Sequence, residues 1–175
     1  MARHHLICNA IAAGITAATF NVGTDDTPDV VDVDAKRTKL LRRAFEDIKQ
    51  GDPGNAAVHV VCDGVPTVRG NRGQNSETYT VMVVLLFQVE DLELTTTDRL
   101  DNLAEEIRDF LAHEDQQRWS AVTDEGETLD GGENCFLRDS APTEPALADE
   151  ALLDEDHVYA TAIIVEIGAE VLNYG

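Results

Sequence analysis

The chain has 175 residues, which suits a single domain with a core of ordinary size. Its 34 acidic side chains outnumber its 13 basic ones and give a formal net charge of -21, which makes the chain a poor general binder of nucleic-acid phosphates. The carboxylates are spread along the whole sequence, so we interpret them as adaptation to high salt and not as a mimic of DNA.

At the N-terminal end, residues 6–18 carry apolar side chains at helical spacing, which predicts a helix. Residues 21–34 are acidic and contain Pro28, which disfavours a helix, so we expect an extended connector there. Within this connector, residues 30–33 are the part best suited to a short edge strand.

A second helix is predicted over residues 35–50, where apolar side chains recur at helical spacing and Gly51 follows as a stop. The same stretch holds nearly half of the chain's basic residues. Our candidate assembly contacts on this basic helix are Lys36, Arg37, Lys39, Arg42 and Arg43. Two interpretations are open: pairing with acidic neighbours in the same chain, or a docking face for an acidic partner or another copy.

Residues 56–62 and 78–90 predict two strands, the second of them long. Residues 63–77 between them are rich in Gly and polar side chains and predict a loop, so the strands should form an extended hairpin with a mobile tip. Arg69 and Arg72 lie in this tip and are further candidate assembly contacts. The tip is either an ordinary loop or a contact arm that becomes ordered on assembly.

The predicted strand over residues 78–90 is apolar on both faces. Its odd positions carry Tyr79, Val81, Val83, Leu85, Phe87 and Val89, and its even positions include Met82, Val84 and Leu86. A strand with one face in water would alternate apolar and polar side chains. A helix of the same chain can cover one face, so we expect a second layer or a neighbouring subunit to cover the other.

A third helix is predicted over residues 98–113, with Thr97 or Asp98 as its N-cap. A short strand is expected over residues 119–123. Residues 124–156 form a long acidic insertion, in which we expect a short strand near residues 135–137 and a helical turn near residues 146–153. Residues 157–171 are strongly apolar again and predict the final strand.

Motifs of common active sites are missing from the sequence. It has no phosphate-binding loop, no nucleophile elbow, no HExxH motif and no cysteine cluster, and its acidic connector lacks the spacing of an EF-hand. We therefore expect no enzyme, no catalytic, metal-binding or cofactor-binding residues, and no cofactor. His4 and His5 are expected at a mobile chain end and are given no role.

The cysteines bear on where the protein is made. Cys8, Cys62 and Cys135 are odd in number and far apart, which implies no disulfide framework. We also expect no signal peptide and no membrane-spanning helix, so synthesis in a reducing cytoplasm fits best.

These elements together predict one α+β domain over residues 1–175. We expect a small, mainly antiparallel β-sheet flanked by two to three α-helices, in a subunit that assembles with other copies. An N-terminal helix with the acidic connector (residues 1–35) and the long acidic insertion (residues 124–156) decorate this core.

The order of elements over residues 36–171 resembles that of the tail terminator proteins of tailed phages. The resemblance implies a structural virion protein of the tail and neck that forms a ring, expected to be a hexamer. Such a ring stops growth of the tail tube, joins the tail to the neck and passes DNA through its lumen without sequence-specific binding. Its partners would be other copies, the tail-tube protein and a neck or head-completion protein, and no membrane. We expect the hairpin tip to contact the next ring in the stack and the basic helix to contact a neighbouring subunit.

The sequence departs from the usual plan of that family at residues 21–34 and 124–156. Its salt-adapted composition implies a virus of a halophilic host. One alternative is another neck or head-completion protein of a tailed virus, which would differ in its partners. Another is a cellular dimeric α/β module that binds a small ligand, which requires a pocket with convergent polar groups. A hydrolytic or metal-dependent enzyme has the least support.

Overall fold

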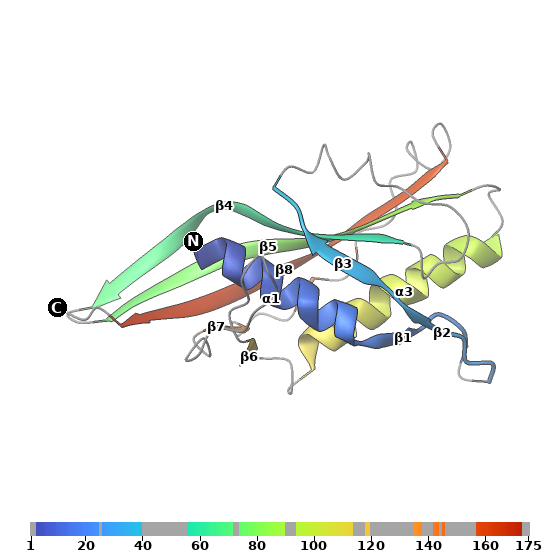
Figure 1. The fold of residues 1–175 in the computed structure, drawn as a ribbon, viewed down its shortest axis with the longest axis horizontal. Helices are drawn as coiled ribbons and strands as arrows, with labels where there is room; N and C mark the ends of the chain where they lie inside the picture. Colours follow the sequence, from blue (N-terminus) through green and yellow to red (C-terminus); the bar gives the residue numbers. More distant parts are fainter. Residues whose placement is uncertain are drawn as a thin grey trace.

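The computed structural model describes residues 3–24, 26–39, 56–71, 74–89, 94–113, 118–119, 135–137, 142–143, 145 and 157–172. Within these residues the chain forms two helices, α1 (Arg3–Ala17) and α3 (Leu94–Ala112). The strands are β1 (Thr19–Asn21), β2 (Val30–Asp32), β3 (Asp34–Arg37), β4 (Ala57–Asn71), β5 (Gln74–Gln88), β6 (Arg118–Trp119), β7 (Cys135–Leu137) and β8 (Val158–Leu172). The fold is α+β, as the sequence predicted (Figure 1).

The main sheet is mixed, and its strands lie in the order β3-β4-β5-β8-β7-β6. The β3–β4 pair is parallel, and the other described pairs of this sheet are antiparallel. Three strands of 15 residues each, β4, β5 and β8, form its centre. β1 and β2 make a separate antiparallel pair. The predicted hairpin and the predicted final strand are confirmed.

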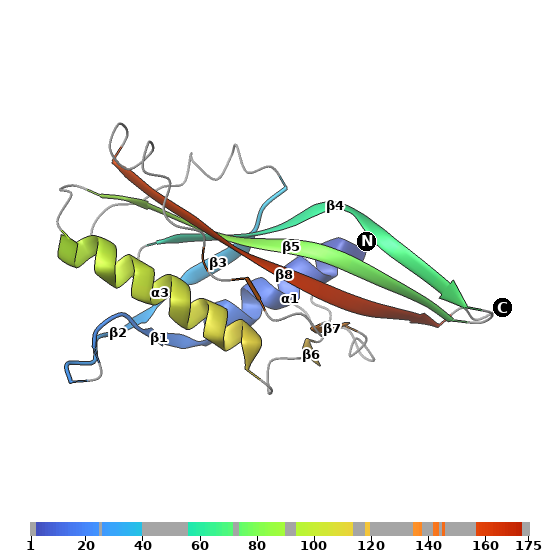
Figure 2. The same ribbon diagram turned by 180° about the vertical axis from the view of Figure 1, so that it is seen from behind.

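Both helices lie on the same side of the sheet and cover one of its faces (Figures 1 and 2). The odd-numbered side chains of β5 from Tyr79 to Phe87 point into this core, where Val83 and Leu85 are fully buried. The helices contribute apolar stripes that include Ile7, Ile11 and Ile15 of α1 and Leu100, Leu103 and Ile107 of α3. The helical spacing that predicted these stripes therefore identified the core correctly.

Tyr159 of β8 connects α3 to the sheet inside this core. Its side chain is 1% exposed, and its hydroxyl donates a 2.7 Å hydrogen bond to Oδ1 of Asp101. Burial and the hydrogen bond to Asp101 raise the pKa of Tyr159 well above its ordinary value. The phenol therefore stays protonated and keeps donating this bond at neutral and mildly alkaline pH.

The predicted helix over residues 35–50 begins as a strand, so the prediction was wrong for its first residues. β3 pairs with β4, with Ala35 opposite Val58. Val33 and Ala35 are buried, whereas Asp34 and Lys36 are exposed, and this period of two belongs to a strand and not to a helix. Residues 40–50, with the rest of the predicted helix, lie outside the described residues.

Element boundaries account for the remaining differences. α3 begins at Leu94, so Thr97 and Asp98 lie within the helix and the predicted N-cap was wrong. Consecutive threonines suit both a cap and a first helical turn, so the sequence could not locate the start. β7 confirms the short strand near residues 135–137. The predicted strand over residues 119–123 is described only at its first residue, within β6, and the predicted turn near residues 146–153 is not among the described residues.

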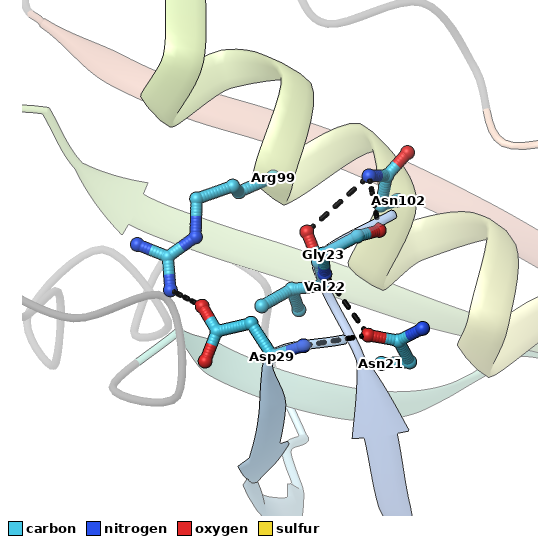
Figure 3. Close-up of polar contacts among 6 residues, drawn as sticks. All are labelled: Asn21, Val22, Gly23, Asp29, Arg99 and Asn102. Carbon is cyan, nitrogen blue, oxygen red and sulfur yellow. Dashed lines mark hydrogen bonds and ion pairs between the residues drawn. The ribbon is translucent and has the colours of Figure 1, made fainter. Parts of the chain in front are cut away.

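The acidic connector packs against α3 through β1 and β2. The expected short strand near residues 30–33 is β2, but it pairs with β1 and not with the main sheet. Phe20 of β1 packs edge-to-face against Phe110 of α3, with ring centroids 5.8 Å apart. On the polar side, Asn102 Nδ2 donates to the carbonyl oxygens of Val22 and Gly23 at 3.3 and 3.2 Å (Figure 3). Arg99 and Asp29 add an ion pair, so this connector is an integral part of the domain (Figure 3).

Gly23 occupies a position in this connector that has no room for a side chain. A Cβ atom there would lie 2.3 Å from the carbonyl oxygen of Thr27 and 2.7 Å from the amide nitrogen of Asp29. We expect Gly23→Ala to lower the free energy of unfolding by about 1–3 kcal/mol, because the backbone of the turn must shift. Thermal denaturation of this variant, with the exposed Asp26→Ala as a control in the same turn, measures the effect. Equal melting temperatures for the two variants would contradict it.

Candidate assembly surfaces

The three long strands continue past the helices and form an arm, which we define as residues 67–71, 74–78 and 168–172. β4 pairs with β5 as far as Asn71 opposite Gln74, and β5 pairs with β8 as far as Gln74 opposite Leu172. Figures 1 and 2 show the three strands running side by side beyond α1 to one end of the molecule. The predicted loop over residues 63–77 was therefore wrong, since the residues described there, 63–71 and 74–77, belong to strands.

Pairing with β8 explains why such a polar stretch forms strands. The breaker Pro66 lies where the β4–β5 register shifts, between Asp63 and Thr67. A bulge tolerates proline because it interrupts the ladder of backbone hydrogen bonds. Beyond it, Thr67 and Val68 favour extended backbone, and β8 supplies the third strand that gives β5 a partner on each side.

The outer edge of β4 is a candidate surface for contact with another chain. β3 pairs with β4 only from Ala57 to Val60, where the amide of Thr38 adds one more bond to the Val60 carbonyl at 3.0 Å. Over residues 61–71, no other described strand pairs with this edge. A strand edge of this kind presents N–H and C=O groups to which a strand of another chain can add.

The second face of the sheet is apolar, as predicted, but its centre is buried within the single chain. Ala57, Val84 and Leu86 form a small cluster there, and Leu86 is 1% exposed. Of the two covers expected for this face, a second layer or a neighbouring subunit, the centre of the face does not need the neighbouring subunit. Towards the arm the face opens, because Met82 is half-buried and Ile164, opposite it on β8, is 41% exposed. We call Met82 and Ile164 the open patch.

The basic residues predicted to share one helix face are separated in the structure. Lys36 and Arg37 are neighbours in β3, so their side chains point to opposite faces of the sheet. Lys36 and Lys39 are exposed and Arg37 is half-buried. Arg69 lies in the arm, opposite Ser76 of β5. The other three candidates, Arg42, Arg43 and Arg72, lie outside the described residues.

Arg37 and Lys39 are brought next to His4 and His5 of α1, and the four residues line one pocket. The sequence analysis missed both histidines, which it placed at a mobile chain end. One signal was present: His4 stands one helical turn before Cys8, so the two share a helix face, and the first turn of α1 has no acidic residue.

Among the residues that the structure describes, no group of three or more His, Cys, Asp or Glu side chains is arranged to hold a metal ion. Neither described helix combines the length and apolar character needed to cross a membrane. A scan against models of protein families and a search of curated proteins both found no match to the chain.

Proposed function

We propose that the protein is a structural virion protein, the tail terminator of a tailed virus that infects a halophilic host. Copies of the chain close into a ring, expected to be a hexamer, at the head-proximal end of the tail tube. The ring stops growth of the tube and joins the tail to the neck. Its partners are the tail-tube protein and a neck or head-completion protein.

The arm is the observation that carries this proposal. Its polar residues form strands beyond both helices, and ordering each residue costs about 1–2 kcal/mol of backbone entropy. In the described chain no helix covers the arm, so packing against a described helix does not offset that cost (Figures 1 and 2). A projecting arm, with a β4 edge that no described strand pairs with, is suited to binding another protein, such as the next ring in a stack.

Two further features support a ring. The open patch is an apolar area at the base of the arm that a neighbouring subunit can cover. A net charge of -21 suits a channel that passes DNA without holding it, because carboxylates repel phosphates.

One observation favours the cellular ligand-binding module as a second candidate. The pocket that Arg37 and Lys39 line with His4 and His5 supplies convergent polar groups, which the sequence analysis required of such a module. This module is expected to be a dimer, so the oligomeric state distinguishes the two functions.

The test of the proposed function is the oligomeric state in about 2 M KCl, where surface repulsion is screened. Sedimentation velocity is expected to show one species above the monomer that fits a hexamer, and negative-stain electron microscopy is expected to show closed rings. A dimer would support the ligand-binding module, and either a dimer or a monomer at the highest concentration measured would contradict the terminator.

Ile163 and Ile164 allow a matched test of the open patch, because neighbours in a strand point to opposite faces. Ile163 is fully buried and Ile164 is 41% exposed. Ile164→Glu is expected to change the melting temperature by less than about 3 °C, because the new carboxylate is in water in the free chain. The variant is expected to remain monomeric, because ring formation would bury this carboxylate against an apolar surface. Ile163→Glu is expected to unfold the chain, at a cost of about 4 kcal/mol or more. Rings formed by Ile164→Glu would exclude the open patch from the ring contacts.

A further inference from the structure

A small pocket lies where the first turn of α1 meets the residues that follow β3. Its volume is about 170 Å³, below the range of about 300–1,000 Å³ that is usual for organic ligands. The lining residues are His4, His5, Cys8, Arg37, Thr38, Lys39 and Cys62. They come from three separate parts of the sequence, so the fold is required to assemble them.

The charge of this pocket is opposite to that of the chain. Arg37 and Lys39 are cationic, and none of the lining residues that the structure describes is acidic, whereas the whole chain carries a net charge of -21. The first turn of α1 also lacks an acidic residue, so no carboxylate of that turn compensates the positive end of the helix dipole. The charged side chains that the structure describes in this lining are therefore basic.

Neutral hydrogen-bonding groups complete the lining. Cys8 is 1% exposed, and its hydrogen bond with Cys62, together with burial, raises the pKa of the Cys8 thiol well above its ordinary value. The Cys8 thiol is therefore uncharged and does not repel an anion in the pocket. Thr38 is held in place by its backbone bond to Val60 and by a 2.7 Å side-chain hydrogen bond with Nδ1 of His59, which is fully buried.

We propose that this pocket binds a single small oxyanion, a phosphate or a carboxylate group, through Arg37 and Lys39. Guanidinium and ammonium groups bind such oxyanions through charge-assisted hydrogen bonds. The size of the pocket admits one such group and excludes a nucleotide. This inference goes beyond the proposed function and does not depend on it, because an anion site is compatible with a ring subunit and with a cellular module.

Isothermal titration calorimetry with inorganic phosphate, at a constant chloride concentration of about 1 M, tests the site directly. The wild-type chain is expected to bind phosphate with saturation at one site. Lys39→Gln and Arg37→Gln are each expected to weaken binding by about fivefold or more, since each removes a charged donor. Lys39 is exposed, so its variant is expected to fold even where loss of the half-buried Arg37 disturbs the packing.

Lys36→Gln is the matched control, because it removes one positive charge from β3 on the face opposite to that of Arg37. It is expected to change phosphate affinity by less than about twofold. Binding without saturation in the wild-type chain would overturn the site. An equal loss of affinity in Lys36→Gln and Lys39→Gln would overturn it as well, because it would reflect the net charge of the chain and not the pocket.

The oxyanion has two possible sources, which sedimentation velocity in saturating phosphate distinguishes. If a carboxylate from another copy occupies the pocket, phosphate displaces it and the oligomers dissociate, as they do in Lys39→Gln. If the pocket takes a free oxyanion, phosphate binds and the oligomers persist. Both sedimentation results are compatible with the anion site, and the calorimetry decides whether the site exists.

Discussion

Particles made with a shortened arm are expected to show heads and tails that fail to join, although the purified variant still folds and forms rings. The variant joins Thr67 to Thr78 through an Asn-Gly turn and ends the chain after Ala169. Thr67 lies opposite Thr78 in the β4–β5 register, so a two-residue hairpin turn can connect them. This change removes nearly all of the surface that the proposal assigns to the next ring in the stack.

The rest of the domain is expected to stay folded, because the buried core residues lie in the part of the chain that the variant keeps. Tyr79 and Ile167 are 4% and 0% exposed, and the variant retains both. Ala169 is kept because it pairs with Cys135 of β7. We expect the melting temperature to fall by less than about 5 °C, since little apolar surface is lost. Sedimentation velocity checks the rings, and electron microscopy of particles checks the joining.

Arg69→Gln is the control for this experiment, because it keeps the length of the arm and removes one of its charges. If backbone pairing at the β4 edge makes the contact, particles with Arg69→Gln stay intact. If they fall apart as well, the contact depends on the charge of Arg69. Normal particles with the shortened arm would exclude the arm from tail attachment.

The long apolar segments were predictable because their burial depends on local pattern. β5 and β8 carry apolar runs that only a buried strand explains, and the spacing in α3 identifies its buried face without reference to other elements. The structure placed each of these elements within a few residues of its prediction.

The arm was not predictable, because a distant strand decides its conformation. Gly64, Pro66 and Gly70 all indicate a loop when the sequence is considered alone. β8 pairs with β5 along its whole length, and this non-local pairing selects strands over the local preference. The same limit hid the pocket, since His4, Lys39 and Cys62 share no sequence pattern and meet only through the packing of α1 on β3 and β4.

The alternation that runs from β2 into β3 was visible in the sequence, but the helical spacing that follows it is longer and decided the prediction. Val31, Val33 and Ala35 recur at a period of two and are all buried. The helical spacing further along the chain covered more residues and extended the predicted helix over Lys36 and Arg37. A short strand next to a helix-like pattern is therefore the type of element that sequence reasoning assigns least well.

Lowering the salt concentration is expected to unfold the chain reversibly. The Debye length grows from about 3 Å in 1 M salt to about 30 Å at 0.01 M. Repulsion between carboxylates is therefore screened at high salt and acts between them at low salt. With a net charge of -21, this repulsion opposes the compact state. We expect the far-UV circular dichroism of the helices and strands to be lost cooperatively below about 0.3 M KCl, and to return when salt is added back.

A charge-reduced variant separates repulsion from other effects of salt. Asp26, Asp32 and Glu105 are exposed, and Asp26→Asn, Asp32→Asn and Glu105→Gln together remove three negative charges without touching the core. If repulsion drives the unfolding, this triple variant needs less KCl to fold, and sodium and potassium chloride act equally. A neutral osmolyte such as sucrose, which does not screen charge, should then fail to replace the salt. A spectrum that stays constant from molar to millimolar salt would show that the carboxylates are not a salt adaptation, and the inference of a halophilic host would lose its basis.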